Sequence, residues 1–164
     1  MKLEGEEAKE QPLRELVLLQ KHMEKALAAQ GRFIKRFQAL AQREGDIMPM
    51  LDLFDCPVAV FQKEGVLHRV NRTLRESTDL REGDVPEGSL SFLARITKEN
   101  FAMLEAAEGI FYGRNALLGR LSSPLELFCK RCFYPVRGDY HSALFFPLPD
   151  GEGCIRYGAV MLMR

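Results

Sequence analysis

The chain has 164 residues, which suffices for one hydrophobic core with an extension but hardly for two full domains. Lysine plus arginine and aspartate plus glutamate both number 23, and this zero net charge argues against a nucleic-acid-binding domain, which normally carries a basic excess. No apolar stretch is long enough to span a membrane, and the charged opening MKLEGEEAKEQ is unlike a signal peptide. Four cysteines without a secretory signal are typical of reduced thiols, so we expect a cytoplasmic protein.

The first predicted element is a long helix from Gln11 to about Glu44, with no proline after Pro12 and one glycine, Gly31. Its apolar residues are spaced alternately by three and four, as in the seam of a coiled coil. The seam consists of Leu13, Leu16, Met23, Leu27, Ile34, Phe37 and Ala41, with Gln20 and Gln30 at polar positions. A helix packed on its own domain would show a similar pattern. The helix length and the glutamines, which resemble register-fixing seam residues, favour pairing of two copies.

After this helix the sequence predicts a short helix and then a hairpin. Asp46 is a candidate N-cap for a helix over IMPMLDLF, which Pro57 ends. The apolar runs Val58–Phe61 and Val66–Val70, joined by a turn that closes on glycine, predict two strands. Asn71 stops the second strand and begins a helix that reaches about residue 78, because its side chain can accept a hydrogen bond from the first turn. If Asn71 acts only as a helix cap, Asn71→Asp should leave the stability of the protein nearly unchanged.

The middle of the chain predicts loops and short helices. DLREGDVPEG is a polar loop, since its glycines and proline interrupt regular structure. SLSFLARI indicates a short helix, and Thr97 with Asn100 opens another, which Gly109 can end. The residues that share one face of that helix are Phe101, Leu104 and Ala107.

The last third predicts strands. Arg114–Leu121 is one, and the segments YHSALFFPL and CIRYGAVMLM are two more, joined by the turn PDGEG. PLELFCKRCF fits either a helical turn or an extension of the preceding strand, and we favour the turn. Helices between two blocks of antiparallel strands indicate an α+β domain with one five-stranded sheet over residues 46–164, behind a helical segment over 1–45. Both faces of the final strands are apolar, so the short helices cover one face and the long helix or a partner subunit covers the other.

The segments DCPVAVFQKEGVLHRVNRTLRES and ALFFPLPDGEGCIRYGAVMLM resemble the opening and the closing hairpin of a PAS domain, the sensory module of many bacterial signalling proteins. The resemblance covers about residues 47–163, with residues 79–139 matching by the order of elements only. It implies a PAS-like sheet with short helices on one face, and the N-terminal helix resembles the signalling helix that often accompanies such domains. It also implies a regulatory role without enzymatic activity, as a homodimer formed through the N-terminal helix and the outer sheet face. A downstream effector domain or partner would then receive the signal.

By analogy with the family, an internal pocket between sheet and helices would take a small, mostly apolar ligand of unknown identity. The candidate lining residues are Ala59, Phe61, Leu67, Leu74, Phe92, Ile96, Phe101, Leu104, Leu117, His141, Ala143, Phe145, Val160 and Leu162. A packed interior without ligand explains the apolar members equally well. His141 could orient a ligand carbonyl or carboxylate, although a structural role is the more frequent one for a histidine.

The sequence supports no cofactor. Haem-binding PAS domains take an axial histidine from the helical half, whereas the three histidines here are His22, His68 and His141. The reactive-cysteine motif of light-oxygen-voltage domains is missing, and the chain has no tryptophan to stack on a flavin. The sequence contains neither a glycine-rich phosphate loop nor a nucleophile–base pattern, so we find no indication of an enzyme.

The alternative hypothesis is a thiol-based redox or metal-responsive protein that uses Cys129 and Cys132. Two thiolates at this spacing can converge, and the basic neighbours Lys130 and Arg131 would lower the thiol pKa. A zinc site needs four ligands, however, and no second Cys-x-x-Cys is present. We therefore favour a structural or incidental role for both cysteines, with no metal site.

Overall fold

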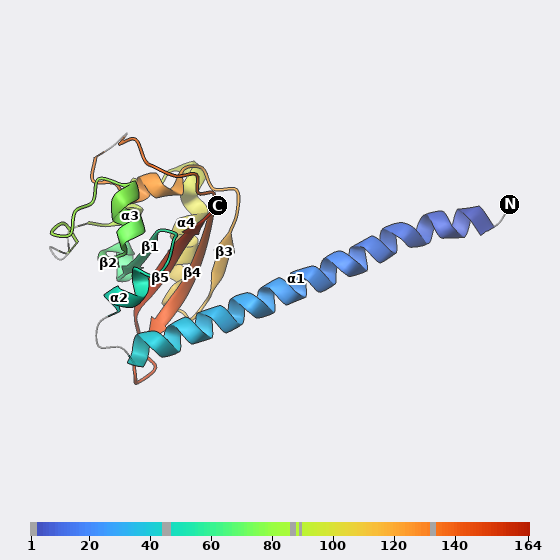
Figure 1. Ribbon diagram of the computed structural model, residues 1–164, viewed down its shortest axis with the longest axis horizontal. Coiled ribbons are helices and arrows are strands. Elements are labelled where there is room, and N and C mark those ends of the chain that lie inside the picture. The colour runs from blue at the N-terminus through green and yellow to red at the C-terminus, as the bar shows by residue number, and fades with distance from the viewer. Residues whose placement is uncertain (1–2, 44–46, 86–87, 89, 132–133) are drawn as a thin grey trace. The chain divides into compact units, whose positions relative to one another are not determined.

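A computed structural model describes residues 3–43, 47–85, 88, 90–131 and 134–164 of the chain (Figure 1). It divides into two compact units, Met1–Ala39 and Leu40–Arg164. The division lies inside the N-terminal helix, ahead of the boundary near residue 45 that the sequence suggests. The second unit contains the sheet and every other helix in the described residues, and it is the unit that carries the candidate site.

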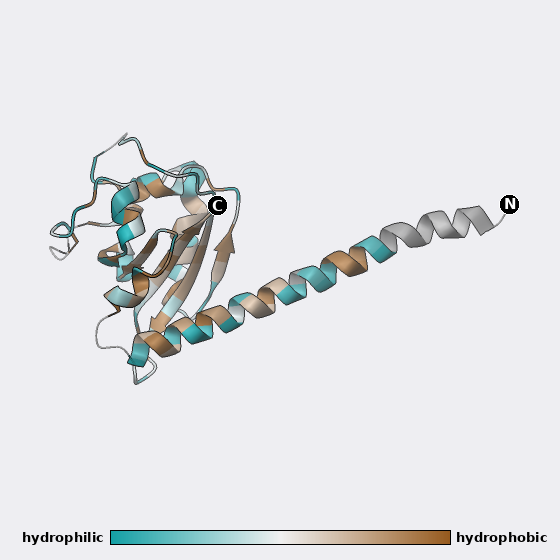
Figure 2. Ribbon diagram, in the orientation of Figure 1, coloured by the Kyte–Doolittle hydropathy of each residue, from teal (hydrophilic) through white to brown (hydrophobic). Residues whose placement is uncertain are grey.

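The N-terminal helix α1 spans Leu3–Arg43. It begins before the expected Gln11 and continues through Pro12, because the residues that precede this proline are mostly Glu, Ala, Lys and Gln, which are good helix formers. Apolar residues recur along it (Figure 2). Two seam residues, Leu16 and Leu27, are both 61% exposed. Within the described residues, no helix is both long and apolar enough to cross a membrane.

The hairpin and its flanking helices follow the predicted order. Helix α2 spans Met48–Leu51, strand β1 spans Val58–Phe61 and strand β2 spans Leu67–Val70, with the 3₁₀ turn η1 (Lys63–Gly65) between the strands. The expected cap Asp46 lies outside the described residues, and the position before α2 is Ile47, which makes no side-chain cap. Helix α3 spans Arg72–Ser77 with Asn71 as its N-cap, as expected.

The central helices are shorter and more often 3₁₀ than the pattern suggests. Turns η2 and η3 span Phe92–Arg95 and Lys98–Asn100, and helix α4 spans Phe101–Ile110. Thr97 makes no side-chain cap to η3, and Gly109 lies inside α4 rather than at its end. The chain reverses instead at Gly113, whose φ of 80° is the left-handed conformation that glycine adopts at little cost.

The last third contains three strands and one 3₁₀ turn. Strand β3 spans only Ala116–Leu118, and the predicted strand over Arg114–Leu121 was too long because Arg120 adopts a left-handed φ of 55°, which ends the pairing. The favoured helical turn is present as η4, Pro124–Phe128, while Cys132 and Phe133 lie outside the described residues. Strands β4, Ser142–Pro149, and β5, Ile155–Met163, form the closing hairpin.

The five strands form one antiparallel sheet in the order β2-β1-β5-β4-β3, which confirms the predicted α+β class. The helices between β2 and β3 stand in the order that the resemblance to PAS domains implies, so the PAS-like fold is confirmed as well. The inward sheet residues join the buried side of α4 in one core, in which α4 contributes Met103, Ala106, Ala107 and Ile110. The alternate residues Val60, Phe146 and Ala159 belong to the outward face.

Candidate functional site

Most of the candidate pocket residues lie together on the inward side of the sheet. Nine of them are buried in one core cluster: Ala59, Phe61, Leu67, Leu74, Phe92, Ala143, Phe145, Val160 and Leu162. Cross-strand register places them in rows, because Val160 on β5 lies opposite Ala59 on one side and Phe145 on the other. Ile96 is partly buried and packs against this cluster. The strand alternation therefore predicted the placement of these side chains, whatever their role.

Three candidate residues do not face the interior. Leu117 is about half exposed and lies opposite Leu144 of the outward face, whereas its neighbour Ala116 lies opposite Phe145. A register error of one residue reverses every side chain of a strand, and β3 is too short for its sequence to reveal the register. Phe101, at the first turn of α4, is also about half exposed.

His141 is the third correction. It precedes β4, and its side chain is 56% exposed. Its Nε2 lies 2.6 Å from Asp139 Oδ1, and its Nδ1 lies 3.3 Å from the carbonyl oxygen of Leu121. The imidazole is thus held by two neighbours at the surface, and it is not positioned to orient a ligand inside the domain.

Phenylalanine rings fill the space between the sheet and the helices. Phe92 of η2 lies 5.1 Å from Phe61 in an edge-to-face arrangement and stacks on Phe128 of η4 at 4.9 Å between ring centroids. Phe145 lies 6.2 Å from Phe61 and 6.5 Å from Phe92. These distances are typical of favourable aromatic pairs. All four rings are less than 2% exposed, so they form the centre of the core.

A cleft of about 670 Å³ opens beside this core rather than inside it. Its walls come from η1, from the segment 91–94 and from the outer side of α4, where Leu104 and Phe111 line it. Leu104 is the one candidate residue in this cleft, and Phe111 was not among the candidates. Phe111 lies 6.2 Å from Phe61, so the cleft adjoins the aromatic core through this ring.

Asn71 is more than a helix cap. Its Oδ1 accepts hydrogen bonds from the backbone N–H of Val58 at 3.0 Å and of Leu74 at 3.1 Å. Its Nδ2 donates to the carbonyl oxygens of Leu51 at 3.1 Å and of Cys56 at 2.9 Å. The fully buried amide therefore ties α2, β1 and α3 together, and the expectation that aspartate would replace it without loss is wrong. Aspartate has no N–H groups to satisfy the two carbonyls.

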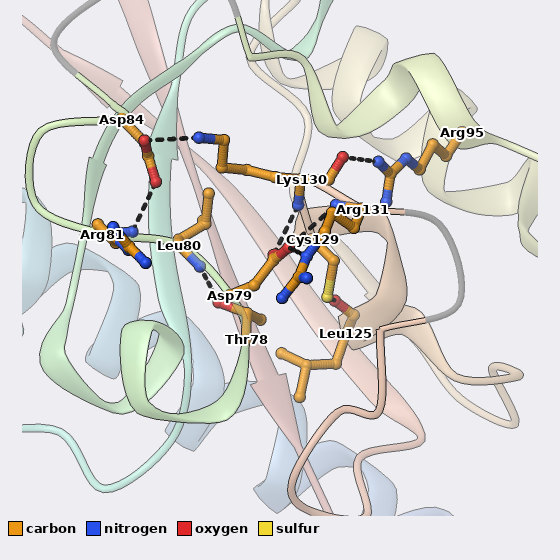
Figure 3. A network of polar contacts seen from close by, with 10 residues as sticks. All are labelled: Thr78, Asp79, Leu80, Arg81, Asp84, Arg95, Leu125, Cys129, Lys130 and Arg131. Atoms are coloured by element: carbon orange, nitrogen blue, oxygen red, sulfur yellow. Dashed lines mark hydrogen bonds and ion pairs between the residues drawn. The ribbon is translucent and has the colours of Figure 1, made fainter.

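Asp79 organises the segment that follows η4 (Figure 3). Its carboxylate accepts the backbone N–H of Lys130 at 2.7 Å and of Arg131 at 3.0 Å, and pairs with Arg131 Nε at 3.3 Å. Although burial acts to raise the pKa of Asp79, these hydrogen bonds together hold the pKa below its ordinary value. The Lys130 ammonium also reaches Asp84 at 2.8 Å. Loop 79–84 thereby fixes the backbone beside Cys129.

The environment of Cys129 opposes redox or metal chemistry. The thiol is buried, and its Sγ lies 3.9 Å from the carbonyl oxygen of Leu125. Burial, with the Asp79 carboxylate nearby, raises the pKa of Cys129 to about 11. The expectation that Lys130 and Arg131 would lower this pKa is wrong, because both of these residues are engaged by acidic side chains. A thiol that stays protonated at neutral pH is a poor nucleophile and a poor ligand.

Asp150, Glu152 and Cys154 place their side-chain ligand atoms within 4.8 Å of one another in the turn between β4 and β5. Oδ1 of Asp150 accepts the backbone N–H groups of Glu152 and Cys154, each at 2.9 Å. Its other oxygen lies 3.5 Å from Arg156 Nε. The carboxylate is thus used to shape the turn.

No protein-family model matches the chain, and a search of curated proteins found no match. Solved structures with a similar fold include a sensory box sensor histidine kinase from Vibrio cholerae, with 9% identity and a TM-score of 0.46 over 85% of this chain and 95% of that chain. The PAS domain of Bordetella pertussis BvgS has 15% identity and a TM-score of 0.43 over 71% of this chain and 80% of that chain. A LOV protein from Rhodobacter sphaeroides has 16% identity and a TM-score of 0.49 over 71% of this chain and 63% of that chain. At such identities the similarity assigns no ligand, partner or activity to this chain.

Proposed function

We propose that the chain is a non-enzymatic, cytoplasmic signal-transduction module in which a PAS-like domain works behind a helix that pairs with a second copy. The observation that carries this proposal is the exposure of two large apolar residues of the α1 seam. Leu16 and Leu27 lie on the predicted seam and are both 61% exposed, although large apolar side chains gain about 2 kcal/mol when fully buried. Pairing two such helices would bury both residues, whereas the seam residues Ile34 and Phe37 are already buried in the single chain.

We infer further that the interior of the domain is a packed core and not a ligand chamber. The four central phenylalanines pack against one another where the sheet meets η2 and η4, with contacting ring centroids 4.9 to 6.5 Å apart. Packing is tight enough that a Cβ at Gly158 of β5 would lie 2.8 Å from Phe61 Cζ and 2.9 Å from Ile110 Cγ2. Real Cβ atoms essentially never approach other atoms this closely, so a side chain at this position would clash, as expected in an interior packed at crystal-like density. The nine buried candidate residues then act as core, and a signal enters elsewhere.

The proposal extends to the output. A change in helix pairing would be passed to an effector domain or partner through α1, since all but the last turn of this helix belongs to a unit of its own. That the outward sheet face joins the dimer contact remains a prediction. The thiol-based alternative is not favoured, because burial raises the pKa of Cys129.

The test is the assembly state of the full chain by sedimentation equilibrium. We expect a dimer for the native sequence and a monomer for the double variant Leu16→Lys, Leu27→Lys, whose charges would face each other across the seam. Leu18→Lys is the matched control, because Leu18 is 58% exposed but lies off the seam. This control should remain dimeric. A monomeric native chain at high micromolar concentration, or equal effects of Leu18→Lys and the seam variant, would reject the proposal.

A further inference from the structure

The cleft beside α4 has the dimensions of a small-molecule site. Its volume of about 670 Å³ lies within the range of roughly 300–1,000 Å³ that is usual for ligand pockets. Leu93, Leu104 and Phe111 supply apolar side chains to it, and Tyr112 stands at its edge with 82% of its surface exposed. An apolar ligand could therefore rest against Phe111 and be partly covered by Tyr112.

Two walls of the cleft are held together before any ligand arrives. Ser91 Oγ donates to the carbonyl oxygen of Glu64 at 2.6 Å, and the Leu67 N–H donates to the Leu90 carbonyl oxygen at 2.8 Å. Gly65 adopts a φ of 75°, and a Cβ at this position would lie 2.6 Å from Leu93 Cγ. The turn η1 is thus packed directly onto η2. Preorganised walls lower the entropy that binding would otherwise lose.

The charges that line the cleft decide the class of ligand. Glu64 and Glu108 contribute two carboxylates, against the single ammonium of Lys63. Within the described residues, none of these three side chains forms an ion pair or a hydrogen bond with another residue of the cleft. Aromatic rings beside carboxylates favour organic cations, since the ring face attracts positive charge. We propose that this cleft binds a small molecule with an apolar body and a protonated amine.

The position of Phe111 connects the cleft to the sheet. Its ring is 6.2 Å from Phe61, and Phe61 is in turn 6.2 Å from Phe145 on β4. A ligand that displaces Phe111 changes the packing of Phe61, and through it the inward face of β1 and β4. This route requires no opening of the core. It also does not depend on α1 pairing, so the seam variant Leu16→Lys, Leu27→Lys should bind the same ligand.

The test uses the full chain, labelled with ¹⁵N, titrated with 2-phenylethylamine and separately with 3-phenylpropanoate. The two probes have similar apolar bodies and opposite charges. We expect saturable shifts of the Gly65, Ala94 and Glu108 amide signals with the amine, and much weaker binding of the carboxylate. Unchanged signals at these positions at millimolar amine, or equal binding of the two probes, would overturn the proposal. Shifts confined to other surfaces would overturn it as well.

A matched pair of variants assigns the charge effect to the cleft. Glu108→Lys reverses a charge that lines the cleft, whereas Glu105→Lys makes the same change on an exposed position of α4 outside it. Replacing an attractive contact with a repulsive one should weaken amine binding about 10-fold in Glu108→Lys, because the residue at this position lines the cleft. Glu105→Lys should bind within about 2-fold of the native chain. Equal weakening in both variants would show a general charge effect and reject the site.

Discussion

At the scale of single residues, Asn71 should contribute strongly to stability. Asn71→Ala removes four hydrogen bonds and leaves the Val58 N–H and the Leu51 carbonyl without their buried partner. We expect a loss of roughly 3–4 kcal/mol in the free energy of unfolding, above the ~1 kcal/mol of an ordinary cap. Asn71→Asp should also lose about 2 kcal/mol, because its second oxygen would face two carbonyl oxygens. Urea denaturation measures both, with the exposed Asn115→Ala as control. A neutral Asn71→Asp would mean that only the cap matters.

The Asp79 carboxylate should make the stability of the folded protein depend on pH. Burial alone would raise the pKa of this carboxyl, but the N–H groups of Lys130 and Arg131 outweigh it and lower the pKa below 3.8 in the folded state. A group with a depressed folded pKa stabilises the protein above its unfolded pKa, and this stabilisation is lost as the pH falls through the folded value. Asp79→Asn should therefore cost about 2 kcal/mol at pH 7, and the difference from the native chain should shrink below about pH 4.

Thermal unfolding of the native chain and Asp79→Asn between pH 3 and 7 measures this effect. The exposed Asp55→Asn is the control, and it should follow the native curve throughout. A difference that stays constant across the range would show that the Asp79 charge is not what holds the segment after η4.

At the scale of elements, a substitution at the contact between β4 and the helical layer tests whether the interior is fully packed. Phe145 is fully buried between Phe61 and Phe92, so Phe145→Ala should open a cavity and lower the free energy of unfolding by roughly 3–5 kcal/mol. Leu117→Ala on the neighbouring strand β3 removes an exposed side chain and should change stability by less than about 0.5 kcal/mol. Chemical denaturation of both variants gives the comparison.

Native mass spectrometry of the unmodified chain tests the opposite possibility, that a small molecule occupies the interior. If a small molecule co-purifies and Phe145→Ala weakens its binding while stability falls by less than about 1 kcal/mol, the interior is a ligand chamber. The packed-core proposal would then be wrong, and the nine buried candidate residues would regain their role as a lining.

The elements that the sequence predicted best are those with a strong local signal. The β1–β2 hairpin, the Asn71 cap and the β4–β5 hairpin have long apolar runs or well-defined turn residues, and alternation along β4 and β5 correctly placed Ala143, Phe145, Val160 and Leu162. Register failed at Leu117, because the strand has only three residues, all apolar, before Gly119 and the left-handed Arg120, and three such residues show no alternation.

The cleft beside α4 and the polar network around Asp79 could not be predicted from the sequence for a different reason. Both bring together segments that are distant along the chain, such as η1 with α4, or Asp79 with Lys130. Phe128 was missed since residues 122–139 have neither helical nor strand periodicity, although a phenylalanine one turn after a proline is a weak signal of a buried 3₁₀ turn. The Phe111 ring could have been suspected only from its position just past the buried face of α4.

At the scale of the whole molecule, the proposed dimer depends on how the α1 seam balances stability against specificity. Gln20 occupies a seam position and is exposed in the single chain, where its Nε2 lies 3.4 Å from Glu24 Oε1. A polar residue in a seam weakens pairing but fixes register and the number of helices. The glutamine would thus hold the paired helices in one register, and it would lower the stability of the dimer, which a purely structural coiled coil would avoid.

Gln20→Leu should therefore strengthen self-association and make it less uniform. We expect the dissociation constant to fall about 10-fold, since burying a leucine in the seam is worth roughly 1.5 kcal/mol or more, and we expect species larger than a dimer to appear. Lys25→Leu adds the same side chain to an exposed position off the seam, and it should leave the assembly unchanged. Sedimentation velocity over a range of concentrations separates the two variants. If Gln20→Leu and Lys25→Leu behaved alike, Gln20 would lie outside the contact, and the seam assigned to α1 would have to be moved to another face of the helix.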